Sequence, residues 1–298
     1  MKRTGKLVPL LEDLMTRPVR IESTSDVEFV RNLLVKQRQR EELRSLKGHY
    51  SPSALANCLR QVYLGKHAGD LGIKRKVPVR VEPNFYFLTG EWLHLKWQYA
   101  LFKLNKALPD EKFALWGTEV PVTSKHKDHG GTIDAICAIN EEYTAVDFKG
   151  VNVRAFSQAE AGDYPLNWGI QLADYLMLAN VDKTLKIPRL EKGLLVFENK
   201  GGPKPGTPIA LLEIEVKLEQ YLPEIKHRLG KLRQSEEENK IPRPECTSTK
   251  SIQFQDCPFR AYCKNEVGKI ESRNAEGRKV EISTRSRTNR ARRNKSKR

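Results

Sequence analysis

The sequence lacks a long apolar run. Across its 298 residues, no stretch approaches the roughly 20 uninterrupted apolar residues that a membrane helix needs. The chain opens with basic residues, but the short apolar stretch that follows contains Pro9 and runs into Glu12 and Asp13, unlike a secretory signal. These absences predict a cytoplasmic protein with no membrane partner.

Cysteine is scarce as well, with five residues in the chain. A reducing compartment disfavours structural disulfides, and clustered cysteines there more often bind metal or take part in chemistry. Three of the five lie within residues 246–263, separated by ten and then five residues, which is looser than the CxxC pairs of zinc ribbons. Four thiolates suit either zinc or a [4Fe–4S] cluster, so their number leaves the metal open.

Acidic residues are almost absent from the C-terminal tail. Between Arg278 and Arg298 there are ten Lys or Arg and one acid, Glu281, so this tail holds +9 of the net charge of +16. A basic protein suits a polyanionic partner such as DNA, because each phosphate contact releases condensed counterions. Surplus lysine that merely keeps the protein soluble is the alternative, and charge alone does not decide between the two.

Hydrophobic periodicity predicts a strand-rich centre between helices. Helices are expected over residues 25–46, 51–62, 90–104, 165–179 and 217–238, and strands over residues 115–123, 131–139, 143–148, 194–197 and 209–216. Residues 1–22, 66–84 and 242–264 look irregular, and disorder is expected from about Glu271 onward. This order predicts an α/β or α+β sandwich core with helical additions.

The centre of the chain carries the most informative side chains. Asp134 is expected on one strand and Asp147 and Lys149 on the next, where alternation places the last two on the same face. Neighbouring carboxylates can hold Mg²⁺ or Mn²⁺, and a lysine beside them can orient water or stabilise charge on a phosphate. An isolated Asp-x-Lys is more often an edge-strand salt bridge. Glu119 is a weaker candidate for a supporting carboxylate.

Four motifs together resemble a known family. Asp134 followed by Asp147-Phe148-Lys149 resembles the split motif of PD-(D/E)xK nucleases, in the GxxD…DxK form of RecB-type nuclease domains. Residues 90–94, Gly-Glu-Trp-Leu-His, resemble the family's GxxxH helix. Gln171 and Tyr175 resemble its QxxxY motif, and their spacing places them on one helical face.

The resemblance implies a fold and a domain arrangement. It covers residues 49–265 and implies a restriction-endonuclease-like three-layer α/β core with helical additions. A lead-in and helix over residues 1–48 would precede this nuclease domain. A basic, disordered tail over residues 266–298 would follow it.

The resemblance also implies roles for individual residues. The ligands of Mg²⁺ or Mn²⁺ would be His94, Asp134, Asp147 and the carbonyl of Phe148. Lys149 would assist the attacking water. Gln171 and Tyr175 would position the DNA or the lysine.

The cysteines resemble those of one subgroup of this family. One cysteine before the catalytic core and three after it is the arrangement in RecB-type nucleases that carry an iron–sulfur cluster. By this resemblance, a [4Fe–4S] cluster is bound by Cys58, Cys246, Cys257 and Cys263. The cluster would staple the N-terminal and C-terminal regions together. Cys137, on the strand face opposite Asp134, is expected to be a buried, inert thiol.

We therefore expect a metal-dependent DNA exonuclease that hydrolyses phosphodiester bonds on single-stranded DNA ends. Two alternatives remain, namely a nuclease fold that binds DNA or a partner without cutting, and an endonuclease on the same core. The intact set of metal ligands and lysine favours an enzyme over a binding module. A protein partner or a homo-oligomer stays open, as do cleavage polarity and biological pathway.

Overall fold

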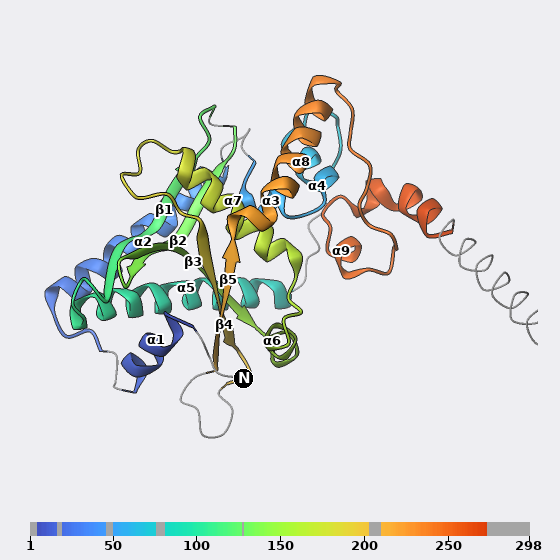
Figure 1. Ribbon diagram of the computed structural model, residues 1–298. Coiled ribbons are helices and arrows are strands. Elements are labelled where there is room, and N and C mark those ends of the chain that lie inside the picture. Colours follow the sequence, from blue (N-terminus) through green and yellow to red (C-terminus); the bar gives the residue numbers. More distant parts are fainter. Residues whose placement is uncertain are drawn as a thin grey trace, which may run out of the picture. The chain divides into compact units, whose positions relative to one another are not determined.

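The structure is a computed structural model that describes residues 5–16, 20–45, 50–75, 81–126, 128–202 and 210–272 (Figure 1). For residues 37–45, 81–91 and 252 the description covers the backbone alone. The tail from residue 273, where disorder is expected, lies outside the described residues. The chain divides into two compact units, residues 1–57 with 80–231 and residues 58–79 with 232–298. The expected boundaries after residues 48 and 265 differ from this division.

The first unit contains a five-stranded mixed sheet whose strands lie in chain order. The strands are β1 (Phe113–Thr123), β2 (Gly130–Ile139), β3 (Glu142–Val151), β4 (Lys192–Asn199) and β5 (Leu211–Lys217). All neighbours are antiparallel except β3 and β4, which are parallel. Asn140 and Glu141 connect β2 to β3 with φ angles of 51° and 65°, as a tight two-residue hairpin requires.

The helices of this unit lie before, between and after the strands. They are α1 (Val8–Met15), α2 (Thr24–Ser45), α3 (Pro52–Leu55), α5 (Val81–Ala107), α6 (Val153–Glu160), α7 (Leu166–Val181) and the first part of α8 (Leu218–Glu237). The helices α6 and α7 form the crossover that the parallel pair β3 and β4 needs.

Helices cover both faces of the sheet. The helix α5 runs along one face of the sheet (Figure 1). On this face the ring of Trp97 stacks 6.2 Å from that of Phe148 in β3. Both α1 and α2 contact α5. The helix α7 covers the other face, since its Gln171 binds Lys149, the strand neighbour of Phe148. The unit therefore has three layers, which confirms the expected α/β core with helical additions.

Most expected elements are present within a few residues of their predicted bounds. All five strands are confirmed, as are α2, α7 and α8. The prediction for α5 was too short, because this helix begins at Val81 rather than Gly90. Charged residues and Pro83 made its start look irregular. Pro83 lies in the first helical turn, where a missing N–H costs no intrahelical hydrogen bond.

In the first unit, two described helices were missed and one expected helix is broken. Residues 1–22 were expected to be irregular, yet α1 forms there and Glu213 accepts hydrogen bonds from the N–H groups of Leu7 and Val8, at 2.8 and 2.9 Å. The missed α6 begins after Asn152, whose side chain accepts a hydrogen bond from Ala155 N at 2.9 Å. The helix expected over residues 51–62 ends at Leu55, and α4 (Leu59–His67) starts after a break.

The second unit is small and mostly helical. It contains α4 (Leu59–His67), the end of α8, α9 (Ile252–Gln255) and a helix over residues 260–272. This last helix corrects the expectation that residues 242–264 are irregular throughout, and it includes residues 266–272 of the tail that was expected to be disordered. A small core forms from Cys246, Phe254, Cys263 and Val267. None of the described helices in either unit is long and apolar enough to cross a membrane.

A close approach of α7 to α8 gives a test of the fold. A Cβ on Gly169 would lie 2.5 Å from Tyr221 Cζ, whereas a Cβ on Gly230 in α8 would meet nothing within 4 Å. Both glycines lie inside helices, so alanine gains about 1 kcal/mol of helix propensity at each position.

We expect Gly230→Ala to raise the free energy of unfolding by roughly 0.5–1 kcal/mol and Gly169→Ala to lower it by about 1–3 kcal/mol, because the tyrosine ring must move. Urea denaturation of the two variants beside the wild type measures the difference. Equal stabilisation by both substitutions would show that Tyr221 does not pack on α7.

Candidate active site

Two carboxylates lie where β2 and β3 separate. Their antiparallel pairing ends at Ala135 and Val146, so Asp134 and Asp147 are the next residues on the two strands. Both side chains are buried, each with an exposed fraction of 3%. The parting of the strands therefore brings together two acids that the chain separates by a hairpin.

Asp134 joins three elements. Its Oδ2 accepts a hydrogen bond from the N–H of Phe148 in β3 at 2.9 Å. The same oxygen lies 2.9 Å from Nδ1 of His94, which is on α5. The aromatic ring of Phe148 packs in the core, so its backbone rather than its side chain faces the carboxylate.

Lys149 lies between a carboxylate and an amide on the α7 side of the sheet. Its Nζ is 2.7 Å from Oδ2 of Asp147 and donates a hydrogen bond to Oε1 of Gln171 at 3.2 Å. Alternation along β3 places Asp147 and Lys149 on the same face, as the sequence predicts. Gln171 thus orients the ammonium group from α7.

The electrostatics of this site are dominated by burial. Burial raises the pKa of Asp147, and the nearby charge of Asp134 raises it further. The Lys149 ammonium and His94 act in the opposite direction and favour the ionised carboxylate. Two buried carboxylates beside one ammonium leave negative charge that a divalent cation would neutralise.

The donor set suits Mg²⁺ or Mn²⁺, which prefer oxygen ligands. Oδ2 of Asp147 is buried and accepts no well-oriented hydrogen bond within the described part of the chain, although the Lys149 ammonium lies beside it. Among the described residues, however, no three His, Cys, Asp or Glu side chains are arranged closely enough to hold a metal ion. Metal binding here therefore requires the side chains of His94, Asp134 and Asp147 to draw together.

Tyr175 occupies a different position from Gln171. It is buried, and its Cε1 lies 2.9 Å from where a Cβ on Gly131 would be. The tyrosine thus packs against the backbone of β2, three residues before Asp134. The two halves of the QxxxY motif contact different groups, because Gln171 reaches the lysine and Tyr175 packs on the strand that carries Asp134.

A second buried histidine–aspartate pair lies beside this motif. His129 Nε2 is 2.7 Å from Oδ2 of Asp174, and both side chains are at most 1% exposed. Burial raises the pKa of Asp174, whereas the hydrogen bond from His129 lowers it. No spacing in the sequence points to this pair, although Asp174 directly precedes Tyr175. It ties α7 to the start of β2.

The second unit brings together the four cysteines outside the sheet. Cys58 precedes α4, while Cys246 and Cys263 lie in the small core of this unit. The pKa of Cys246 is raised to about 11, first by burial and then by the charges of Cys58, Cys257 and Cys263. The thiols are therefore near enough to influence one another, although they do not form a ready metal site.

Arg60 ties α4 to the C-terminal segment of this unit. Its Nη1 lies 2.7 Å from Oε2 of Glu266 and 3.9 Å from Sγ of Cys263, and its Nε donates to the carbonyl of Pro242 at 2.5 Å. Burial raises the pKa of Cys263, and the guanidinium lowers it.

The fifth cysteine lies apart from these four. Cys137 is fully buried in the core between α5 and the sheet. Burial also raises the pKa of its thiol. These features suit a protonated thiol that packs as a small apolar side chain.

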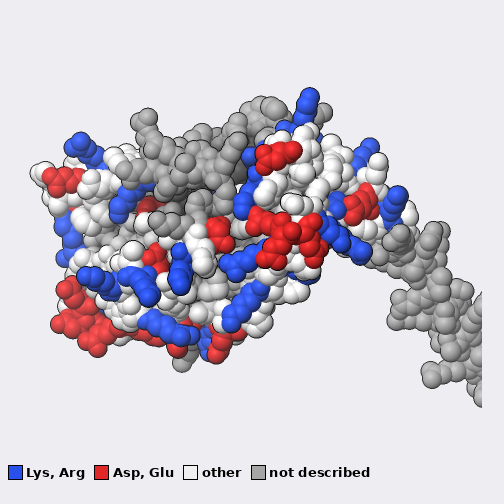
Figure 2. Space-filling model, turned by 90° about the horizontal axis from the view of Figure 1, so that it is seen from above, with Lys and Arg blue, Asp and Glu red and all other residues white. Residues whose placement is uncertain are grey.

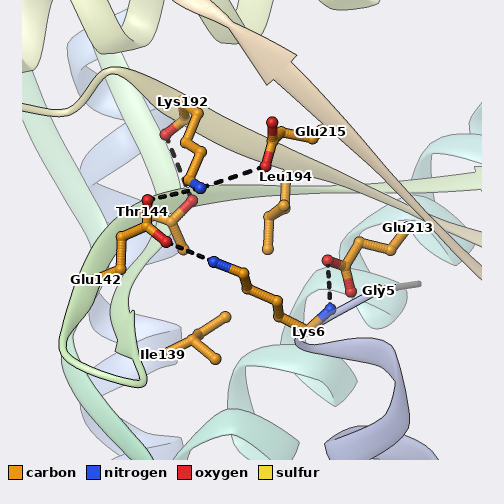
Figure 3. A pocket seen from close by; sticks show the side chains of 9 residues that line it. All are labelled: Gly5, Lys6, Ile139, Glu142, Thr144, Lys192, Leu194, Glu213 and Glu215. Atoms are coloured by element: carbon orange, nitrogen blue, oxygen red, sulfur yellow. Dashed lines mark hydrogen bonds and ion pairs between the residues drawn. The ribbon is translucent and has the colours of Figure 1, made fainter.

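A recess of about 270 Å³ lies at the other end of the sheet (Figure 3). Its charged side chains are paired, since Lys192 Nζ is 2.6 Å from Glu142 Oε1 and Lys6 Nζ is 2.5 Å from Glu142 Oε2. Glu142 begins β3 and Lys149 lies seven residues further along it, a span of roughly 23 Å. The recess is therefore separate from Asp134 and Asp147, which lie where β2 and β3 separate.

Comparison with known proteins does not identify this chain. No family model and no curated protein matches it. Among solved structures, the crystal structure of SSO0001 is similar at 20% sequence identity, covering 70% of this chain and 85% of that chain, with a TM-score of 0.39. A TM-score this low carries no argument about fold family or function.

Proposed function

We propose that this protein is a metal-dependent nuclease with a restriction-endonuclease-like core, which hydrolyses phosphodiester bonds in DNA. One observation carries the proposal. The acidic, imidazole and ammonium groups of four separate motifs converge where β2 and β3 separate, with Asp134 beside His94 and Lys149 between Asp147 and Gln171. A chance Asp-x-Lys salt bridge would not gather the other three motifs around it.

The chain's own residues have distinct parts in this chemistry. His94, Asp134 and Asp147 would hold Mg²⁺ or Mn²⁺, with the Phe148 carbonyl as a further ligand. When bound, the cation neutralises the phosphate and lowers the pKa of a water ligand. Lys149 presents its ammonium group to the phosphate or the attacking water, and Gln171 holds this group in place. Tyr175 supports β2 by packing on Gly131.

The substrate we propose is a DNA end, with single-stranded DNA preferred. The net charge of +16 suits phosphate contacts. On the face shown in Figure 2, however, basic and acidic side chains are interspersed. The basic tail would add non-specific, salt-sensitive affinity, while selection of ends would come from the surroundings of the site.

Digestion of end-labelled single-stranded DNA with Mn²⁺ tests the site. We expect Lys149→Ala and Asp134→Ala to lower the rate by about 10²–10³-fold, because each removes a charge that faces the reacting phosphate or its cation. Lys192→Ala is the matched control, since this strand lysine is also paired with a carboxylate but lies in the recess at the other end of the sheet. It should cleave like the wild type.

Other outcomes separate the alternatives. Equal rates in the wild type and both site variants would refute the assignment. Cleavage of circular single-stranded DNA would identify an endonuclease, because a strict exonuclease needs an end. Metal-independent DNA binding without cleavage of any end or strand type would identify a binding module.

We also propose that Cys58, Cys246, Cys257 and Cys263 bind a [4Fe–4S] cluster. The support is that these four thiols gather in one small unit from segments almost two hundred residues apart. A cluster would add folding free energy to a unit whose described apolar core holds few residues. Its role would be structural.

Anaerobic purification tests the cluster. The protein should be brown, absorb near ~400 nm and contain about four iron and four sulfide per chain. Cys246→Ser should lose most of the iron, because it removes one thiolate. Cys137→Ala should keep it, because this cysteine lies in the other core. Stoichiometric zinc without iron in the wild type would overturn the assignment.

A further inference from the structure

A buried amide connects the candidate site to β1. Gln98 lies one helical turn after His94 on α5 and has an exposed fraction of 0%. Its Nε2 donates hydrogen bonds to Oε1 of Glu119 at 2.8 Å and to the backbone carbonyl of Asp134 at 2.9 Å. Both hydrogens of the amide are thus directed at acceptors on β1 and β2.

Glu119 occupies an unusual place in β1. The pairs of Thr118 with Ala135 and of Val120 with Ile133 place Glu119 directly opposite Asp134. Its side chain is 4% exposed, and its φ of 49° is in the left-handed region, which costs energy for a residue with a Cβ. Such a conformation persists only where the surroundings enforce it, and the hydrogen bond from Gln98 is one such constraint.

The hydrogen-bonding capacity of the Gln98 amide is only partly satisfied. Its Oε1 is buried and accepts no hydrogen bond within the described part of the chain. A buried polar atom of this kind is costly, so an apolar side chain would serve packing alone better. The position therefore suits a role that needs the two N–H groups.

We propose that Gln98 is a positioning residue for Asp134. This inference rests on the proposed nuclease site. His94 and Gln98 are four residues apart and share one face of α5, so the same helix face contacts both the carboxylate and the backbone carbonyl of Asp134. Glu119 anchors the amide from the other side. Gln98 and Glu119 together fix the backbone of β2 at Asp134. The Asp134 carboxylate consequently keeps its hydrogen bond from the N–H of Phe148.

Hydrogen exchange of the Phe148 amide tests this directly, with no need of metal or substrate. Gln98→Met keeps the side-chain length but removes both donated hydrogen bonds. We expect Phe148 N–H to exchange about tenfold faster, the factor that one lost hydrogen bond of typical strength corresponds to. The amides of the β4–β5 ladder serve as the internal control and should be unchanged.

Variants of Glu119 supply the matched comparison. Glu119→Gln retains an oxygen acceptor of the same size and should leave exchange at Phe148 as in the wild type. Glu119→Ala removes the anchor and should behave like Gln98→Met. An unchanged Phe148 rate in Gln98→Met, or an equal rise across the β4–β5 ladder, would overturn the positioning role.

Mn²⁺ affinity supplies a second readout. Gln98→Met should weaken binding about 10–100-fold, as loss of a group that supports a metal ligand does. Loss of Mn²⁺ binding in Glu119→Gln as severe as in Glu119→Ala would make Glu119 a ligand itself and overturn the role assigned to the pair. If the wild type bound no Mn²⁺, the proposed nuclease site would fall, while exchange at Phe148 would still decide whether Gln98 positions Asp134.

Discussion

The structure of the first unit depends on how Asp134 is held where β2 and β3 part. A buried carboxylate is stable only when hydrogen bonds or charges replace the water that it loses. Here the N–H of Phe148 on β3 and the His94 ring on α5 replace that water, while the Gln98 amide, also on α5, holds the backbone carbonyl of the same residue. The same constraint that satisfies the buried acid therefore assembles the candidate site.

Local patterns were sufficient to predict much of this unit. Alternation along β3 placed Asp147 and Lys149 on one face, as found. A place for Gln171 beside the lysine was implied by the family resemblance, and Lys149 Nζ lies 3.2 Å from its Oε1. The convergence of α5 with β2 could not follow from spacing, because His94 and Asp134 meet only through tertiary packing. It was expected from the family resemblance alone.

The features that sequence reasoning missed depend on contacts between residues that lie far apart in the chain. The start of α1 is capped by Glu213, which lies about two hundred residues further along the chain, so no local signal marks this helix. Spacing also gives no sign that the ring of Tyr175 packs where Gly131 lacks a side chain. Only the i, i+4 spacing from His94 could have indicated Gln98.

Mn²⁺ binding in the absence of DNA tests the central claim most directly. Calorimetry should show Mn²⁺ binding to the wild type and at least tenfold weaker binding to Asp134→Asn. Asp174→Asn is the matched control, because this buried aspartate is also paired with a histidine but lies outside the site, and it should bind like the wild type. Absence of Mn²⁺ binding to the wild type, or equal losses in the two variants, would contradict a metal site where β2 and β3 separate.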